Sequence, residues 1–314
     1  MKRVAICLLS VVVAGVGLMP LGCSPALQLG SLQPDGLFTL GKERYENGKY
    51  VKAVEAFQTL VYNFPGEPVI DTAQYYLALS YFASEDYILA EREFNRLLLN
   101  YPSSVYVVHA QFMRAVCFFE GTPGHYGLDQ SDLTEAIGQF EDFIIDHPES
   151  ELMPDARAYL LQAKTRLAKK YYESGMVYVH IGRPSPAATY FQKVIDDFTD
   201  TEFAARSSFQ MAELEFKRMD YEEARRLFDN FLIVFSDHEW SDKARKGTEE
   251  AAFKQAERAY KSGEPALARK LFEAFKRDFP ESKRTGKTDK YLKKIGEMPV
   301  EGSSVEQASS GDDR

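Results

Sequence analysis

The sequence predicts an all-α solenoid of about six helical hairpins, in which the fourth hairpin begins with an extended helix. Three observations lead to this fold class: an alanine–aromatic spacing that occurs six times, a small residue at a set distance before it, and a turn residue after it. The 314 residues are 45% hydrophobic and 27% charged, which provides a core and excludes a disordered chain. Gly and Pro number only 20 and 14, which excludes collagen-like and low-complexity classes.

The second helix of each hairpin is predicted by an alanine, a phenylalanine four residues later, and an aromatic residue or histidine seven residues after that. Spacings of four and seven keep one helical face, so each segment forms an amphipathic helix. The six sets are Ala53/Phe57/Phe64, Ala90/Phe94/Tyr101, Ala136/Phe140/His147, Ala187/Phe191/Phe198, Ala224/Phe228/Phe235 and Ala268/Phe272/Phe279. Proline ends four of these helices because it cannot continue them. The residues at the six ends are Pro65, Pro102, Pro148, Thr199, Ser236 and Pro280.

The first helix of each hairpin has a small residue at its centre, which lets two helix backbones approach closely, and an aromatic residue three positions before it. The six pairs are Phe38/Gly41, Tyr75/Ala78, Phe112/Ala115, Tyr172/Gly175, Phe209/Ala212 and Phe253/Ala256. The fourth and sixth first helices are longer than the others by 14 and 7 residues, which are whole multiples of two helical turns. We therefore predict one long helix from about Met153 to Ile181.

These offsets resemble those of the tetratricopeptide repeat, a helix-turn-helix unit of about 34 residues. Six unrelated hairpins would have to reproduce the same offsets by chance. The resemblance implies a superhelix whose first helices line a concave surface suited to an extended peptide. We assign repeats 1–3 to residues 35–149, repeats 4–6 to residues 150–298, and a polar disordered tail to residues 299–314.

The N-terminus has the pattern of an export signal. Lys2 and Arg3 precede an apolar stretch from Val4 to Met19, so residues 1–22 are expected to form a signal peptide. The segment Leu21-Gly22-Cys23-Ser24 resembles a bacterial lipobox, which makes Cys23 the lipidated residue and residues 23–34 the lipid anchor and tether. Since Ser rather than Asp follows the cysteine, the resemblance implies the outer membrane, facing the periplasm. Pro20 departs from the usual motif, so cleavage and secretion without a lipid is the alternative.

Residues 120–132 interrupt the third hairpin and are expected to form a surface loop. Three segments, Met113-Arg114, Asp129-Gln130-Ser131-Asp132 and Leu167-Ala168-Lys169, make the chain from Cys23 to about Phe235 resemble the BamD family of outer-membrane assembly lipoproteins. The resemblance implies a non-catalytic scaffold of the β-barrel assembly complex. Such a scaffold binds the POTRA domain of the barrel-forming subunit BamA, other lipoproteins of the complex and unfolded outer-membrane proteins. The sixth repeat, at about residues 243–296, departs from the five repeats of that family.

Four aromatic residues of the N-terminal repeats are candidates for a peptide-binding groove. They lie on the predicted first helices and could stack on the aromatic side chains of an unfolded barrel protein. The alternative is that they form the core between repeats, because a single hairpin cannot bury its own apolar face. The candidates are Tyr75, Phe82, Phe112 and Phe119.

Arg114 stands among apolar neighbours, so we expect it to form an ion pair with Asp129 or Asp132 and thereby hold the inserted loop. The alternative is an arginine that extends its charged end to water. Cys117 is expected to be a small buried hydrophobic residue.

Charge is unevenly distributed along the chain. Residues 24–202 contain 14 basic and 25 acidic side chains, whereas residues 203–294 contain 21 basic and 17 acidic ones. This positive segment could bind an acidic partner domain, or its charges could be solvated helix faces. The candidates for partner binding are Arg206, Lys217, Arg218, Arg225 and Arg226.

The sequence contains no pattern that predicts catalysis, a cofactor or a metal site. The three cysteines at 7, 23 and 117 have no metal-ligand spacing, and the five histidines are scattered. A net charge of −9 argues against a nucleic-acid partner. We therefore expect a binding protein rather than an enzyme. The second hypothesis is a repeat lipoprotein that serves as an adaptor in cell-envelope remodelling or pilus assembly.

Overall fold

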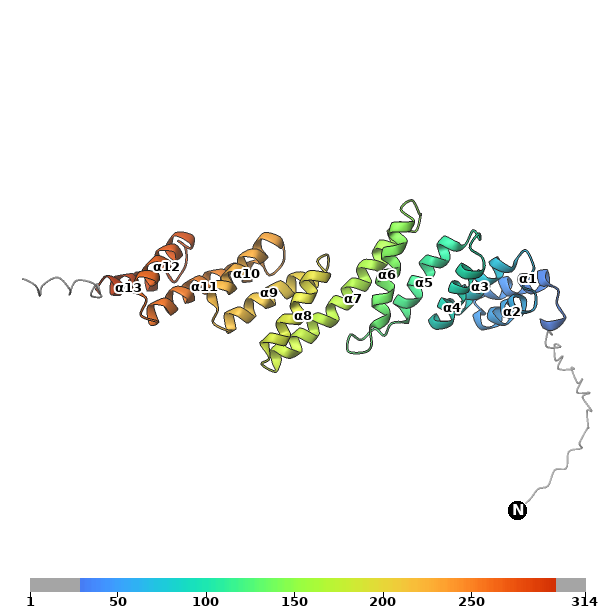
Figure 1. The fold of residues 1–314 in the computed structure, drawn as a ribbon, viewed down its shortest axis with the longest axis horizontal. Coiled ribbons are helices and arrows are strands. Elements are labelled where there is room, and N and C mark those ends of the chain that lie inside the picture. The colour runs from blue at the N-terminus through green and yellow to red at the C-terminus, as the bar shows by residue number, and fades with distance from the viewer. Residues whose placement is uncertain (1–28, 298–314) are drawn as a thin grey trace, which may run out of the picture.

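The computed structural model describes residues 29–297, and within this range the chain is helical without a strand. Six antiparallel hairpins follow one another along an elongated rod, with α1 at one end and α13 at the other (Figure 1). This confirms the predicted all-α repeat solenoid. The elements are η1 (Leu29–Ser31), α1 (Pro34–Glu46), α2 (Tyr50–Asn63), α3 (Ile70–Ala83), α4 (Tyr87–Asn100), α5 (Val107–Gly121), α6 (Ser131–Asp146), α7 (Met153–His180), α8 (Pro184–Asp197), α9 (Glu202–Lys217), α10 (Tyr221–Val234), α11 (Ser241–Lys261), α12 (Pro265–Asp278) and α13 (Thr285–Gly296).

Several predictions fall outside the described residues, namely the signal peptide, lipidation at Cys23 and the tail at 299–314. The structure describes the last part of the expected tether, and this part packs against the folded hairpins. Residues Leu29–Ser31 form the short helix η1, and Leu29 and Leu32 pack against the core of the first hairpins.

The predicted alanine–phenylalanine pairs form the centre of every hairpin, because all twelve side chains are fully buried. The small residues opposite them are equally constrained. A Cβ atom added to Gly175 would lie 2.6 Å from the ring of Phe191, and one added to Gly41 would lie 2.7 Å from the ring of Phe57. At the recurrent small residue, the first helix therefore packs directly against the phenylalanine ring of the second helix.

The turns inside five of the six hairpins share one backbone conformation. Gly48, Gly182 and Gly263 adopt positive φ at the end of a first helix, which glycine does at little steric cost. In two other hairpins the same place is taken by Glu85 (φ 63°) and Met219 (φ 64°), where a side chain is strained.

The long helix predicted in the fourth hairpin is confirmed as α7, which has 28 residues. Its N-terminal half packs on the third hairpin, where the ring of Tyr159 stacks on Phe140 with centroids 5.6 Å apart. Its C-terminal half packs on α8 through Gly175. One helix thus belongs to two hairpins.

The sequence pattern did not reveal the last helix, α13. It closes the sixth hairpin by burying Ile295 and by stacking the ring of Tyr291 on Phe272, with centroids 4.9 Å apart. The α13 helix is short and lacks the alanine–aromatic spacing, so its hydrophobic side is visible only once α11 and α12 are in place.

Candidate binding surfaces

Two of the four candidate groove residues are core residues, which corrects their assignment to a groove. Phe112 and Phe119 are each 7% exposed. Both rings pack on Tyr159 of α7, with centroids 6.0 and 5.2 Å away. Since α7 covers them, they hold the third hairpin against the fourth and cannot stack on a peptide.

The other two, Tyr75 and Phe82, are half-buried. The ring of Tyr75 stacks on that of Tyr106 with centroids 4.4 Å apart, and burial raises the pKa of Tyr75 to about 12. Phe82 packs edge-on against Tyr87. Their rings are partly occupied by intramolecular contacts, and their role in a groove stays a prediction.

Arg114 does not form the expected ion pair with Asp129 or Asp132. Its Nε donates a hydrogen bond of 3.0 Å to Oε1 of Glu91 on α4, so it joins the third hairpin to the second. Asp129 instead accepts a hydrogen bond from the backbone N–H of Ser131, and this bond lowers the pKa of its carboxyl. The inserted loop therefore has no contact with Arg114 through these acids.

The residue that holds the inserted loop is Arg166 of α7, which sequence reasoning missed. Its guanidinium donates to the backbone carbonyls of Phe119, Thr122 and Pro123 at 2.9–3.1 Å and lies over the ring of Phe119. The amide of Gln130 donates to the carbonyl of Pro123 at 2.8 Å from inside the loop. Because its acceptors are backbone atoms, no residue type in the loop indicates this contact.

Two of the candidate basic residues connect hairpins. Arg225 of α10 donates to Asp278 at the end of α12 at 2.9 Å, and Arg206 of α9 lies over the ring of Trp240. Arg226 forms an ion pair within its own helix with Glu223. These contacts make all three arginines part of the rod's own structure, and their role in partner binding stays a prediction.

The remaining pair, Lys217 and Arg218, borders an open apolar depression of about 190 Å³ that we call the basic-rimmed depression. Val179 and Leu214 contribute its apolar wall, and the turn between α7 and α8 closes one side. Its lining residues are Val179, Gly182, Pro184, Leu214, Lys217 and Arg218. Ile181 and Met219, next in the chain to two of these residues, are both 59% exposed. The surface thus combines exposed apolar side chains with two cationic groups, of which Arg218 forms an ion pair of 3.1 Å with Glu215.

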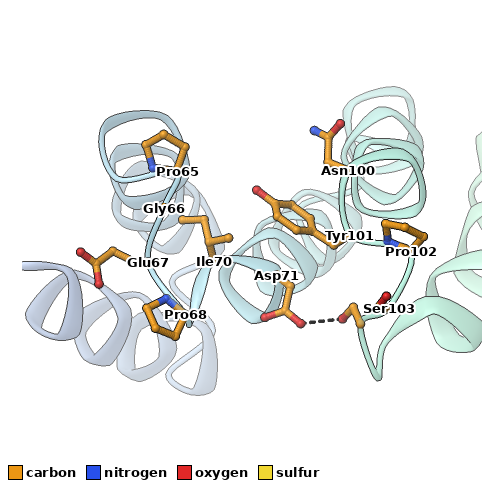
Figure 2. Close-up of a pocket in the computed structure, with 11 residues that line it drawn as sticks. Pro65, Gly66, Glu67, Pro68, Ile70, Asp71, Asn100, Tyr101, Pro102 and Ser103 are labelled. Carbon is orange, nitrogen blue, oxygen red and sulfur yellow. Dashed lines mark hydrogen bonds between the residues drawn. The ribbon is translucent and has the colours of Figure 1, made fainter.

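A second, larger depression of about 470 Å³ lies between the α2–α3 turn and the α4–α5 turn (Figure 2). We call it the turn depression. The side chains of Asp71 and Tyr101 lie between the two turns, and Ser104 Oγ donates to Asp71 Oδ2 at 2.7 Å. Pro65 and Pro102, which the sequence marks as helix ends, stand on opposite sides. Its lining is polar and proline-rich, and Val105 beside it is 83% exposed.

Other chemistry is limited within the described part of the chain. Among residues 29–297, no three His, Cys, Asp or Glu side chains are grouped so that they could hold a metal ion. In that same range no helix combines the length and apolar character needed to cross a bilayer. Cys117 is 2% exposed, as expected, and burial raises the pKa of its thiol.

Solved structures similar to this chain are repeat proteins with low sequence identity. A TPR2AB-domain:pHSP90 complex of yeast Sti1 is 14% identical with a TM-score of 0.38, over 84% of this chain and 98% of that chain. A TPR repeats protein from Bacteroides fragilis is 11% identical with a TM-score of 0.36, over 85% and 99%. A tetratricopeptide repeat protein from Parabacteroides merdae is 14% identical with a TM-score of 0.31, over 84% and 98%.

No curated protein sequence matches the chain. Two family profiles do. Residues 250–282 match a tetratricopeptide repeat, which covers the second half of α11 and all of α12 in the sixth hairpin. Residues 31–214, more than half of the chain, match the family YfiO, described as an outer membrane lipoprotein. The chain therefore belongs to the YfiO family of outer membrane lipoproteins and is built as a tetratricopeptide-repeat scaffold for protein binding.

Proposed function

We propose that this protein is a lipid-anchored scaffold of the β-barrel assembly complex on the periplasmic face of the outer membrane. It binds unfolded outer-membrane proteins and the POTRA domain of the barrel-forming subunit BamA, together with other lipoproteins of the complex. The observation that carries this proposal is the family match over residues 31–214 in a chain whose residues Leu21–Ser24 have a lipobox pattern.

The two depressions support a division of labour along the rod. The basic-rimmed depression presents Lys217 and Arg218 beside apolar side chains, which suits an acidic folded domain with an apolar patch. We assign it to the POTRA domain. The turn depression is larger, open and flanked by the exposed residues Pro65 and Gly66, which suits an extended chain. We assign it to unfolded outer-membrane proteins.

Site-specific photo-crosslinking in cells tests both assignments. A photoreactive amino acid replaces Ile181 beside the basic-rimmed depression or Val105 beside the turn depression. We expect capture of BamA at the first position and of unfolded outer-membrane proteins at the second. Ile88, which is 70% exposed and lines neither depression, is the matched control. Capture of the same proteins at all three positions, or of no barrel protein at any, would contradict the assignments.

Charge reversal tests the acidic character of the first partner. Lys217→Glu with Arg218→Glu is expected to reduce co-purification of BamA at least tenfold, because like charges facing one another cost several kcal/mol. The control is Lys270→Glu, an exposed lysine on α12 outside the depression. Equal loss in both variants would mean that net charge, not this surface, governs the interaction.

Lipidation is tested by mass spectrometry of the mature N-terminus and by membrane fractionation. We expect acyl chains on Cys23 and release of the Cys23→Ser variant from the membrane fraction. If the purified complex contained envelope-remodelling or pilus proteins and no barrel subunit, the adaptor hypothesis would replace the assembly role.

A further inference from the structure

The outer face of α1, the side turned away from α2 and α3, is not covered by another helix of the described residues. A depression of about 420 Å³ opens on it. Its lining combines the half-buried Leu40, Gly36 and Leu32, which also packs against the first hairpins, with polar side chains, namely Asp35, Thr39 and Glu43. On an adjacent side of the same helix, Leu37 and Gly41 are buried against the first hairpin. The helix therefore has apolar residues on two sides, and on the outer side Leu40 is only half-buried.

In the other hairpins, the equivalent face of the first helix packs against the preceding hairpin. Gly36 stands five residues before the recurrent small residue Gly41. In four of the five later hairpins the equivalent residues are fully buried on helices that pack against the preceding hairpin, namely Ala73, Ala110, Ser207 and Ala251, whereas the fourth hairpin has the half-buried Lys170. Leu40 is likewise equivalent to Leu77, which is fully buried on α3. The outer face of α1 is thus a repeat interface without a preceding repeat.

Terminal repeats of solenoids normally present a polar outer face, so an apolar one requires a covering partner. The segment that links this face to the anchor is too short to supply that partner. Only five residues separate Cys23 from Leu29, and five residues make little more than one helical turn. A cover for this face therefore has to come from elsewhere.

The same short segment determines which surface lies closest. A chain reaches at most about 3.6 Å per residue, so Leu29 stays within about 20 Å of Cys23. With the acyl chains of Cys23 in the bilayer, α1, itself about 20 Å long, lies beside the lipid headgroups. The rim of the depression carries Asp35 and Glu43, which anionic headgroups would repel.

We propose that the outer face of α1, around Leu32, Gly36 and Leu40, docks on the zwitterionic lipid surface that holds the acyl chains of Cys23. This inference rests on the lipidation that forms part of the proposed function. Docking orients the rod so that α1 contacts the membrane and the later hairpins extend away from it. The lipid anchor then fixes an orientation as well as a location.

Fluorescence quenching on vesicles tests the proposal with the full lipidated protein. The chain has a single tryptophan, Trp240, which is first replaced by Phe. Leu40→Trp then reports on the α1 face. Ile233→Trp is the matched control, because Ile233 is an exposed apolar residue on α10, far along the rod (Figure 1). Circular dichroism verifies that both variants fold.

On phosphatidylcholine vesicles with brominated acyl chains, the Leu40→Trp variant is expected to lose most of its emission and the Ile233→Trp variant none, since docked apolar faces lie about 5–10 Å into the headgroup boundary. Adding anionic lipid is expected to reduce the quenching, and an increase would overturn the zwitterionic assignment. Quenching of both variants to the same extent would overturn the orientation.

Flotation separates failure of the docking from failure of the anchor. If the Leu40→Trp protein floats with the vesicles but its emission is not quenched, docking is wrong although the anchor exists. If that emission is shielded only in a dimer, a second copy covers the face and the lipid proposal is wrong. If the unaltered protein does not float with the vesicles, both lipidation and docking are contradicted. Slower hydrogen exchange of α1 on vesicles than in the Cys23→Ser protein gives the same answer without a substitution in α1.

Discussion

The hydroxyl of Tyr291 on α13 donates a hydrogen bond of 2.9 Å to the carboxylate of Glu257 on α11. Glu257 is 6% exposed and also accepts hydrogen bonds from Lys287 and Lys254. Burial raises the pKa of Glu257, but these hydrogen bonds outweigh it and hold the pKa at about 2. A single carboxylate therefore ties the terminal helix to the sixth hairpin.

This arrangement predicts acid sensitivity at the C-terminal end. The folded pKa lies below the value of the unfolded chain, so the stabilisation is complete above about pH 5 and is lost as the pH falls through 4.5 towards 2. The gap corresponds to about 3 kcal/mol at neutral pH. Glu257→Gln is expected to remove most of this pH dependence and to accelerate hydrogen exchange in α13. Glu273→Gln, at an exposed position of α12, is the control and should change neither.

Replacing glycine by alanine is expected to have opposite effects on stability at Gly175, where two helices pack closely, and at Gly138. Gly175→Ala places a methyl group against Phe191 and is expected to destabilise the protein by about 1–3 kcal/mol. Gly138→Ala, in α6 with no atom within 4 Å of the new Cβ, is expected to stabilise it by about 0.4–1 kcal/mol. Urea unfolding measures both. If both substitutions changed the free energy of unfolding in the same direction, helix propensity, and not the contact with Phe191, would determine the effect at position 175.

The positive φ of Glu85 predicts that glycine is preferred there. Glu85→Gly is expected to raise the free energy of unfolding by about 0.5–1 kcal/mol, because the strained backbone is relieved. Gly182→Ala, at the matching turn of the fourth hairpin, is expected to lower it by about 1 kcal/mol. Thermal unfolding of the two variants provides the comparison, and a destabilised Glu85→Gly protein would argue against strain at this turn.

Arg166 predicts the behaviour of the inserted loop. Arg166→Lys keeps the charge but cannot reach three carbonyls at once, so amide exchange in residues 122–130 is expected to accelerate about tenfold, equivalent to about 1.4 kcal/mol. Arg157→Lys is the control, because Arg157 is an exposed residue of the same helix. An unchanged exchange rate in the Arg166 variant would mean that Gln130 alone holds the loop.

The hairpins could be predicted because their signals are local. Spacing of Ala187 and Phe191 along one helix face determines their burial whatever surrounds them, and the excess length before Gly175 predicts α7 without a view of the structure. The pattern fixes which residues face the core of a hairpin. It does not fix how one hairpin meets the next.

The contacts between hairpins could not be predicted for that reason. Arg114 was expected to pair within its own hairpin, but its partner Glu91 comes 23 residues earlier, on the preceding one. Phe112 and Phe119 were plausible groove residues until α7 was found to cover them. The basic-rimmed depression combines Val179 with Leu214, residues that only the packing of α9 on α7 brings together.

The dual membership of α7 has a consequence for how the rod comes apart. In repeat proteins whose units touch only their neighbours, unfolding can begin at one end and spread unit by unit. Here one buried cluster runs from Phe112 through α7 to Phe203, so the third and fourth hairpins share α7 and the fifth hairpin packs against it. Melting α7 removes support from the hairpins on both sides of it at once, so we expect the third, fourth and fifth hairpins to unfold together.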